Sequence, residues 1–523
     1  MGQFYFGANI YVAMNWTRSH GGKITLISGY LAQAYGVVLS LAFVPYILRT
    51  IGAESYGLVG VFLLAMNCFQ LLDAGMTAAL TRETSRYKGG AGNAQALTNT
   101  LRGLESVVWL SALPILVLTW LISDNTASQW IKRETLSHEE VVIAFNLMAP
   151  ILLLRWWSEV RRGISVGLER HATLNAVDVT LATLRFPGIA VLFSVIQPSS
   201  TAYFSYQLLV GLFEAMLLTF VSARIMPVAR ADRMWRCIRS LRTIAPFALN
   251  HAVLALLWVL VSQTDKFLLS KLLSLSQFGY FTLAVTAAGG VFLLTLPITQ
   301  MLRPRLTRLQ TENSTAQMHA TYRRFSRIAA VFLSASGVCF ACFGPPIILV
   351  WTADAHIARE AGAVFAWYSA GNAALAISGF AYHLQYAMGN LRRAIVGASG
   401  FLLILAPALI LATQSYGMLG AAITWAATSL LYLLIWVTVV HRKLLNGQHW
   451  NWLFNDVLRI VVPTLLVAMA LRQWIALPQD RILLAFTLLT IGFSLFLVAL
   501  ASSGLLSLHT LAARRAAPVD SSR

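Results

Sequence analysis

The sequence predicts an all-α polytopic membrane protein of about fourteen transmembrane helices. Of its 523 residues 58% are hydrophobic and only 11% are charged, whereas roughly a quarter of the residues of a soluble protein are charged. Apolar segments of about 20 residues, long enough to cross a bilayer as a helix, also recur from one end of the chain to the other. A soluble enzyme with a single apolar helix is therefore excluded.

The predicted spans follow one another with short polar connections. The stretch before the first span mixes polar and aromatic side chains and lacks the apolar core of a cleavable signal. Polar turns, such as those after residues 48 and 167, and proline or glycine breaks separate the later spans. The fourteen segments cover about residues 24–48, 56–80, 104–122, 141–167, 173–196, 202–223, 244–268, 278–301, 328–350, 362–388, 394–413, 419–440, 457–474 and 482–504.

Positively charged residues predict how the spans are oriented. The net charge of +19 lies in short clusters between spans, which follows the positive-inside rule and argues against nucleic-acid binding, where one solvated face would be basic. Placing both termini in the cytoplasm puts most arginines in inside loops. The outside loops then hold only Arg49, Lys132, Arg133, Lys266, Lys271, Arg359, Arg472 and Arg481.

A weak internal repeat predicts two pseudo-symmetric lobes. Residues 269–285 align with residues 47–63 at an offset of 222, so that Lys271 matches Arg49 and Gly279 matches Gly57. Internal repeats of this kind are typical of transporters. We expect an N-terminal lobe over residues 1–223, a basic cytoplasmic linker over 224–243, a C-terminal lobe over 244–440, and two extra helices with a cytoplasmic tail over 441–523.

Charged residues inside the spans indicate a candidate binding site. Arg155 and Arg185 lie near the middle of the fourth and fifth predicted spans. Each would cost on the order of 3 kcal/mol or more against lipid, so both should face protein or a wet cavity. Helical spacing then turns charge toward a common interior from three neighbouring spans. The residues concerned are Arg155, Glu159 and Arg162 on the fourth span, Asp178 and Arg185 on the fifth, and Glu214 on the sixth.

Two interpretations of these charges stay open. Arg155 can be paired with Glu159, and Arg185 with Glu214 or Asp178, simply to hold the helices together. Counting Arg161 and Arg162, however, the arginines exceed what that pairing requires, and a surplus of guanidinium groups suits a phosphate-bearing or acidic cargo. On this second interpretation the substrate-binding residues are Arg155, Arg185, Arg162 and Glu159.

Catalytic motifs do not occur in the context that they require. The segment Gly163–Gly167 matches GxSxG, but it ends a predicted membrane helix with no strand before it, so Ser165 is not expected to be a nucleophile. The sequence has no phosphate-binding loop of the ATPase type and no metal-spaced cluster of histidine and cysteine. We therefore expect no enzyme activity, no metal and no cofactor.

The stretch LISGYLAQAYGVVLSLAFVPYILRTIGAESYGLVGVF, followed by LLDAGMTAALTRETSR, resembles the N-terminal signature of the polysaccharide transporter family. These are the Wzx-type oligosaccharide flippases of the multidrug/oligosaccharidyl-lipid/polysaccharide exporter superfamily. The specific match covers about residues 26–88, and beyond it the span count, the internal repeat and the turn after the fourth span agree. The motif residues are Gly57, Asp73, Gly75, Arg82 and Arg86.

The resemblance implies two lobes around a central cavity that alternates access between cytoplasm and periplasm. The cargo would be a polyprenyl-pyrophosphate-linked oligosaccharide, the repeat unit of O-antigen, exopolysaccharide or capsule, moved from the inner to the outer leaflet of the bacterial inner membrane. Partners would be this cargo, membrane lipids, a polysaccharide polymerase and a chain-length regulator, with the flippase itself a monomer. Without an ATPase, an ion gradient or downstream polymerisation would drive transport, with Glu159, Asp178 and Glu214 as candidate proton or sodium sites.

Two other functions stay open. A multidrug exporter of the same superfamily usually has an acidic cavity for cationic drugs, which the arginine surplus does not favour. A membrane polysaccharide polymerase or ligase tends to have a large periplasmic loop, whereas the longest outside loop predicted here covers only about residues 123–140.

Overall fold

The computed structural model describes residues 20–505 apart from 70, 72, 74, 91, 228–231, 244, 390–391 and 446, and, in addition, not the side chains of 20–27, 30, 243 and 245–255. Within the described residues the chain is helical and has no strand, only an isolated bridge between Lys132 and Ser274. The all-α prediction is therefore confirmed. Ten of the described helices are long and apolar enough to cross a membrane, and the count of fourteen stays a prediction.

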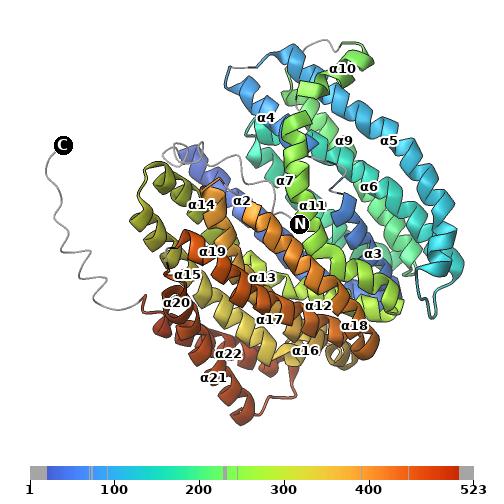
Figure 1. Ribbon diagram of the computed structural model, residues 1–523. Coiled ribbons are helices and arrows are strands. Elements are labelled where there is room, and N and C mark those ends of the chain that lie inside the picture. Colours follow the sequence, from blue (N-terminus) through green and yellow to red (C-terminus); the bar gives the residue numbers. More distant parts are fainter. Residues whose placement is uncertain are drawn as a thin grey trace. The chain divides into compact units, whose positions relative to one another are not determined.

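Two compact units make up the chain, Met1–Gly279 and Tyr280–Arg523 (Figure 1). In the first unit, the long helix α6 (His138–Gly167) packs against both α5 (Ala94–Gln129) and α9 (Ser200–Ile225). Its helices are α2 (His20–Ile51), α3 (Ala53–Phe69), α4 (Met76–Lys88), α5 (Ala94–Gln129), α6 (His138–Gly167), α7 (His171–Arg185), α8 (Pro187–Val195), α9 (Ser200–Ile225), α10 (Met234–Ser240), η1 (Leu241–Thr243), α11 (Ala245–Leu272) and the start of α12 (Leu275–Ala288).

Local sequence signals set several helix ends in this unit. Ser137 and Glu140 form a capping box that begins α6, and the Asn93 side chain caps α5. Pro187 stands at the first turn of α8, where its missing N–H is not needed, and this separates α7 from α8 within one predicted span. The turn expected after the fourth predicted span follows α6, and its residue Glu169 has a positive φ of 58°.

Small residues let α4 pack tightly on α6. A methyl group added to Gly167 would lie 2.7 Å from the carbonyl oxygen of Thr81, and one added to Gly163 would lie 3.2 Å from that of Thr77. Hydroxyl groups bridge the same contact, because Thr81 Oγ1 donates to the Gly163 carbonyl at 3.2 Å. The GxSxG-like segment of α6 is thus a packing surface for α4.

The repeat predicted from sequence meets itself where α3 crosses α12. A methyl group at Gly57 would lie 2.2 Å from the carbonyl oxygen of Leu275, and a methyl group at Gly279 would lie 2.2 Å from that of Ala53. Gly57 and Gly279 are equivalent at the offset of 222 residues, and so are Ala53 and Leu275. The contact is therefore reciprocal: Gly57 of the first repeat meets Leu275 of the second, and Gly279 of the second meets Ala53 of the first.

Glu54 joins the start of α3 to the connection between α5 and α6. Its carboxylate accepts hydrogen bonds from the backbone N–H groups of Glu134, Thr135 and Leu136 at 2.6, 2.8 and 3.1 Å, and from the Thr135 hydroxyl. Burial opposes the ionisation of Glu54, but these hydrogen bonds outweigh it and hold the pKa of the carboxyl below its usual value.

Replacing Glu54 by glutamine is expected to lower the free energy of unfolding by about 1.5–3 kcal/mol, because a neutral amide cannot accept all of these hydrogen bonds. The lowered pKa means that the contribution of Glu54 is present above the unfolded-state pKa of about 4.3 and is lost as pH falls through the folded-state value. Thermal unfolding of the purified protein at pH 7 and at pH 3–4 measures both effects. A Gln variant as stable as the parent at pH 7 would contradict the prediction.

The second unit is also built of long packed helices, with its core between α14, α15 and α17 (Figure 1). Its helices are the rest of α12, α13 (Gly290–Leu293), α14 (Leu296–Thr311), α15 (Thr315–Cys342), α16 (Gly344–Thr352), α17 (Ala355–Ala387), α18 (Arg392–Leu431), the π-helix η2 (Tyr432–Trp436), α19 (Val437–Leu444), α20 (His449–Asn451), the π-helix η3 (Trp452–Leu458), α21 (Arg459–Trp474) and α22 (Arg481–Ser502).

Two predicted spans, 394–413 and 419–440, run on as a single stretch of helix in this unit. Gly417 interrupts α18 with φ 57° and ψ −144°, a conformation that only glycine adopts without strain. The 53-residue stretch from Arg392 to Leu444 would measure about 80 Å if straight, far more than a bilayer needs. The kink at Gly417 therefore coincides with the turn that the sequence places between two spans.

Asp456 is a buried carboxylate that the sequence analysis did not single out. It lies on η3, is fully buried, and pairs with Arg323 of α15 at 2.6 Å from Nε to Oδ2. Arg327, one turn further along α15, donates from Nε to Oδ1 at 2.9 Å. The two arginines tie the helix that precedes α21 to the core of the unit.

Replacing Asp456 by asparagine is expected to destabilise the protein by about 3–5 kcal/mol, because two partly buried arginines lose the carboxylate that they share. Asp480→Asn is the matched control, since Asp480 is exposed and caps α22 by accepting from the Leu483 N–H, and asparagine caps as well as aspartate. Thermal unfolding of both variants checks this. Equal losses in the two would contradict it.

The first compact unit extends past the predicted linker at residues 224–243. It reaches Gly279 because α11 packs against α3 and α4. The predicted division into an N-terminal lobe, a linker, a C-terminal lobe and two extra helices stays a prediction.

Candidate functional site

Six charged side chains meet where α6, α7 and α9 pack together. The three helices contact one another in pairs, and the helical spacing of the charges turns them toward this shared interior. They come from Arg155, Glu159 and Arg162 of α6, Asp178 and Arg185 of α7, and Glu214 of α9. We call these six residues the charged cluster.

Glu214 is the buried centre of the charged cluster. Its side chain is 3% exposed and forms an ion pair with Arg185. Its other oxygen lies 3.7 Å from Nη2 of Arg162. A carboxylate this far from solvent is stabilised by opposite charge on two sides, which holds α9 against both α6 and α7.

Arg162 connects the buried part of the charged cluster to its exposed part. Its Nη1 donates to Asp178 Oδ1 at 2.6 Å, and its Nε lies 3.8 Å from Glu159 Oε1. The side chains of Glu159 and Asp178 are 41% and 45% exposed, whereas that of Arg162 is only 15% exposed. The charged cluster is therefore exposed at the carboxylates of Glu159 and Asp178 and buried at Glu214.

Arg155 differs from the other arginines of the charged cluster. In the part of the chain that the structure describes, no carboxylate lies within ion-pair distance of it, and its buried Nε has no hydrogen-bond partner. It nevertheless lies near enough to Arg185 and Glu214 for the charges to act on one another. The predicted pairing of Arg155 with Glu159 is absent, and Arg155 is left with unused donors beside Arg185.

The surplus of arginine that the sequence suggested is absent from the charged cluster. Arg161 pairs with Glu105 of α5 and donates to Ser222 Oγ of α9 at 3.2 Å. Six residues separate it from Arg155, which places it about 240° around α6 and therefore on another face. Counting Arg161 toward the surplus was wrong, and the charged cluster holds three arginines and three carboxylates.

The motif residues are not members of the charged cluster, although Asp73 lies near enough to Glu159 for their charges to act on one another. The Asp73 carboxylate accepts from the hydroxyl of Thr77 at 2.6 Å, and Gly75 precedes α4 with φ 74°. Arg82 and Arg86 are on the exposed side of α4, with Arg86 3.2 Å from Glu83. Gly57, the remaining motif residue, is at the crossing of α3 and α12.

Sequence reasoning missed Glu105 and Asp456, which hold arginines inside the fold. Glu105 is 5% exposed and accepts from two arginines of α5 and α6. The predicted span begins at residue 457, just after Asp456. For Glu105 the available signal was Arg102, three residues before it on the same helix. Arg161 and Arg323 are distant in sequence from the carboxylates that they pair with, so spacing could not reveal those pairs.

Solved structures with the same arrangement of helices are transporters and flippases. The lipid II flippase MurJ in an inward closed conformation aligns with a TM-score of 0.69 at 12% identity, over 93% of this chain and 99% of that chain. An inward-facing multidrug resistance transporter of the MATE family, in the MOP superfamily, aligns with a TM-score of 0.61 at 12% identity, over 79% and 95%. A MOP superfamily transporter from Pyrococcus furiosus aligns with a TM-score of 0.50 at 12% identity, over 80% and 94%.

The fold is therefore that of a MurJ-like or MATE-like membrane transporter. At identities this low, the similarity establishes the fold alone. No curated protein sequence matches the chain. A family model described as polysaccharide biosynthesis protein matches residues 25–310, and the chain belongs to this family. Both findings confirm the resemblance drawn from the N-terminal signature, and the family and its fold neighbours are transporters and flippases rather than enzymes.

Proposed function

We propose that the protein is a flippase that moves a polyprenyl-pyrophosphate-linked oligosaccharide from the inner to the outer leaflet by alternating access. The observation that carries this proposal is Arg155, an arginine inside a membrane-spanning helix with a buried, unpartnered Nε and no carboxylate at ion-pair distance among the described residues. Family membership and the MurJ-like fold support it. The cargo would be a repeat unit of O-antigen, exopolysaccharide or capsule.

The pyrophosphate of such a cargo fits the free donors of the charged cluster. A guanidinium group binds phosphate oxygens through two parallel hydrogen bonds. Arg155 offers its Nε, and the Nε atoms of Arg162 and Arg185 are also buried without a hydrogen-bond partner. The exposed carboxylate of Glu159 lies on the same face of α6 and would accept from sugar hydroxyl groups.

Glu214 and Asp178 are the candidates for ion coupling. When a pyrophosphate binds Arg185, the ion pair between Arg185 and Glu214 weakens, and a buried carboxylate that loses its partner takes up a proton or sodium ion. Asp178 would exchange ions with solvent through its exposed side. Transport that continues unchanged after both the proton and the sodium gradients are collapsed would exclude this role.

The location and partners follow from the same proposal. The distribution of basic loops supports a multi-pass protein of the bacterial inner membrane with both termini in the cytoplasm. A monomer would pass its cargo to a polysaccharide polymerase and a chain-length regulator. Labelling single cysteines introduced at Arg359 and at Arg442 with an impermeant reagent tests the orientation, which requires label at the first position only.

Lipid analysis of a deletion strain tests the function itself. Mass spectrometry of its lipid extract should show an accumulated, unpolymerised polyprenyl-pyrophosphate oligosaccharide together with loss of surface polysaccharide. The unit should resist a glycosidase that cannot cross the membrane. Intact surface polysaccharide with no accumulation would favour a multidrug exporter of the same fold, whereas a glycosidase-sensitive unit would mean a polymerase or ligase that acts after the flip.

A further inference from the structure

One face of α10 and η1 is docked firmly on α5. Cys237 is 1% exposed, and a methyl group added to Gly103 of α5 would lie 2.4 Å from its carbonyl oxygen. The same added methyl group would lie 3.0 Å from the Leu241 side chain. Gly103 thus allows the backbone of α10 to approach the backbone of α5, and the contact leaves one side of the short helix buried.

A polar contact fixes the position of this helix along α5. The Asn99 amide donates to the Asp232 carboxylate at 2.8 Å and accepts from the Asp232 N–H at 3.0 Å. Asp232 stands two residues before α10. The segment is therefore held at a defined place and orientation, and the Asp232 carboxylate is bound by Asn99.

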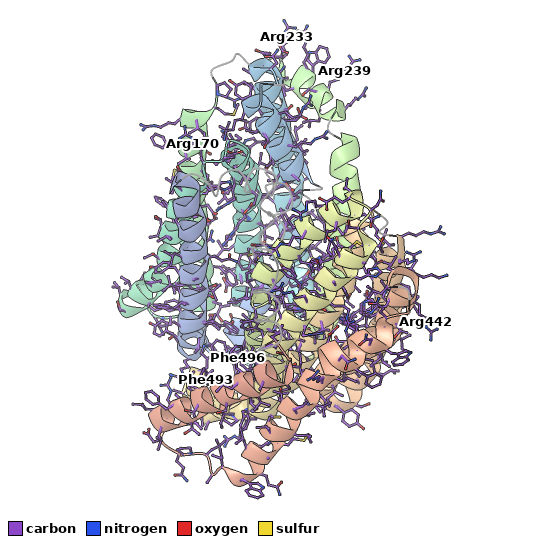
Figure 2. All side chains as sticks on the ribbon, turned by 90° about the vertical axis from the view of Figure 1, so that its left-hand side faces the viewer. Arg170, Arg233, Arg239, Arg442, Phe493 and Phe496 are labelled. Carbon is purple, nitrogen blue, oxygen red and sulfur yellow. The ribbon has the colours of Figure 1, made fainter. Side chains whose placement is uncertain are left out.

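The opposite face carries arginines and large apolar side chains. Successive residues of a helix are about 100° apart around its axis. On this count, the residues that lie about 140–200° from Cys237 include Trp235, Arg239 and Arg242. Met234 and Trp235 are 51% and 54% exposed, and the segment contains no acidic residue. Figure 2 shows Arg233 and Arg239 projecting outward at one end of the first unit. The exposed arginines are Arg233, Arg236, Arg239 and Arg242.

The chain keeps this face close to the ends of two membrane helices. The candidate span Ser200–Ile225 ends nine residues before Met234. On the other side α11 begins at Ala245, two residues after η1 ends, a separation of at most about 7 Å. Arg242 therefore cannot move far from the level at which α11 begins.

We propose that the outward face of α10 and η1 binds the anionic phosphate headgroups of the surrounding membrane lipids. Tryptophan and methionine next to arginine suit the boundary between headgroups and acyl chains, where the apolar groups insert and the guanidinium groups bind phosphate. An acidic soluble protein would match the arginines but would leave the tryptophan and methionine without an apolar environment. The surface uses none of the residues of the charged cluster.

Retention of phosphatidylglycerol by the purified full-length protein tests the proposal. The variant Arg236→Gln/Arg239→Gln/Arg242→Gln removes three exposed arginines, two on this face and Arg236 at its edge, and each contributes about fivefold to binding at an anionic membrane surface. Native mass spectrometry after exchange from phosphatidylglycerol nanodiscs should therefore show on the order of a hundredfold weaker retention at this site. Single Arg239→Gln should show an intermediate loss.

Arg133→Gln/Arg359→Gln/Arg472→Gln is the matched control, because it removes the same charge from three exposed arginines of predicted outside loops. It should retain phosphatidylglycerol like the parent. Brominated phosphatidylglycerol should also quench the fluorescence of the parent more than that of Trp235→Phe, while brominated phosphatidylcholine should not distinguish them. Equal retention by the two triple variants, or equal quenching by the two lipids, would overturn the proposal, and stabilisation by soluble polyglutamate alone would indicate an acidic protein partner instead.

Discussion

Replacing Arg155 by glutamine is expected to slow flipping by at least about 30-fold, which corresponds to the 2–5 kcal/mol lost when one partner of a buried, hydrogen-bonded charge pair is removed. Stability should change little, because Arg155 has no ion pair among the described residues. Arg155→Lys should rescue only part of the activity, since an ammonium group cannot form the two parallel hydrogen bonds of a guanidinium. Inner-leaflet accumulation of the lipid-linked unit, at matched expression, measures the effect.

Arg161→Gln is the matched control on the same helix. This substitution removes an arginine that pairs with Glu105 on α5, so it should lower the melting temperature. Arg102 still contacts Glu105 at 3.2 Å, which limits the loss, and flipping per folded molecule should stay unchanged. If Arg155→Gln also behaves in this way, with lost stability and normal flipping, then Arg155 is a structural residue and the proposed binding role fails.

A methyl group at the crossing of α3 and α12 should have the largest effect on folding. Gly57→Ala and Gly279→Ala each place Cβ 2.2 Å from a backbone carbonyl oxygen, which cannot move aside as a side chain could. We expect a loss of about 3 kcal/mol or more in each, at the upper end of what overpacking costs. Thermal unfolding in detergent and the yield of folded protein measure it.

Gly36→Ala is the control for this pair, because the structure places nothing within 4 Å of a methyl group there. An alanine inside α2 should raise stability slightly, by about 0.5–1 kcal/mol. Similar effects at Gly36 and Gly57 would mean that the helices do not cross closely. A loss at Gly57 without one at Gly279 would contradict the reciprocal contact between the two repeats.

Much of the fold follows from local properties of the chain. The run of apolar segments predicts the helices, and the turn at Gly417 and the break before Pro187 coincide with residues that cannot continue a regular helix. The repeat offset also pairs Gly57 with Gly279 before any contact is known. These features depend on backbone conformation and hydrophobicity, which act over a few residues and are therefore visible in sequence.

The charged cluster could be predicted only in part. The spacing of Arg155, Glu159 and Arg162 on one face of a helix indicates that they share an environment, and the structure brings them to the interface with α7 and α9. The partners could be named only as alternatives, because pairing depends on how far each helix slides and rotates against the next. Of the two carboxylates suggested for Arg185, Glu214 and Asp178, the structure pairs it with Glu214. The sequence therefore suggested Glu159 as the partner of Arg155, whereas Glu159 lies beside Arg162 instead.

Sequence alone determined that the protein is an all-helical membrane protein of the polysaccharide transporter type, with charge inside its first lobe. Only the tertiary structure decided which charges are paired. Arg161 is matched by Glu105, Arg185 by Glu214 and Arg323 by Asp456, whereas Arg155 has no ion pair among the described residues. The physical reason is that hydrophobic periodicity is a property of one helix, whereas the pairing of buried charges is a property of the packed interface between several.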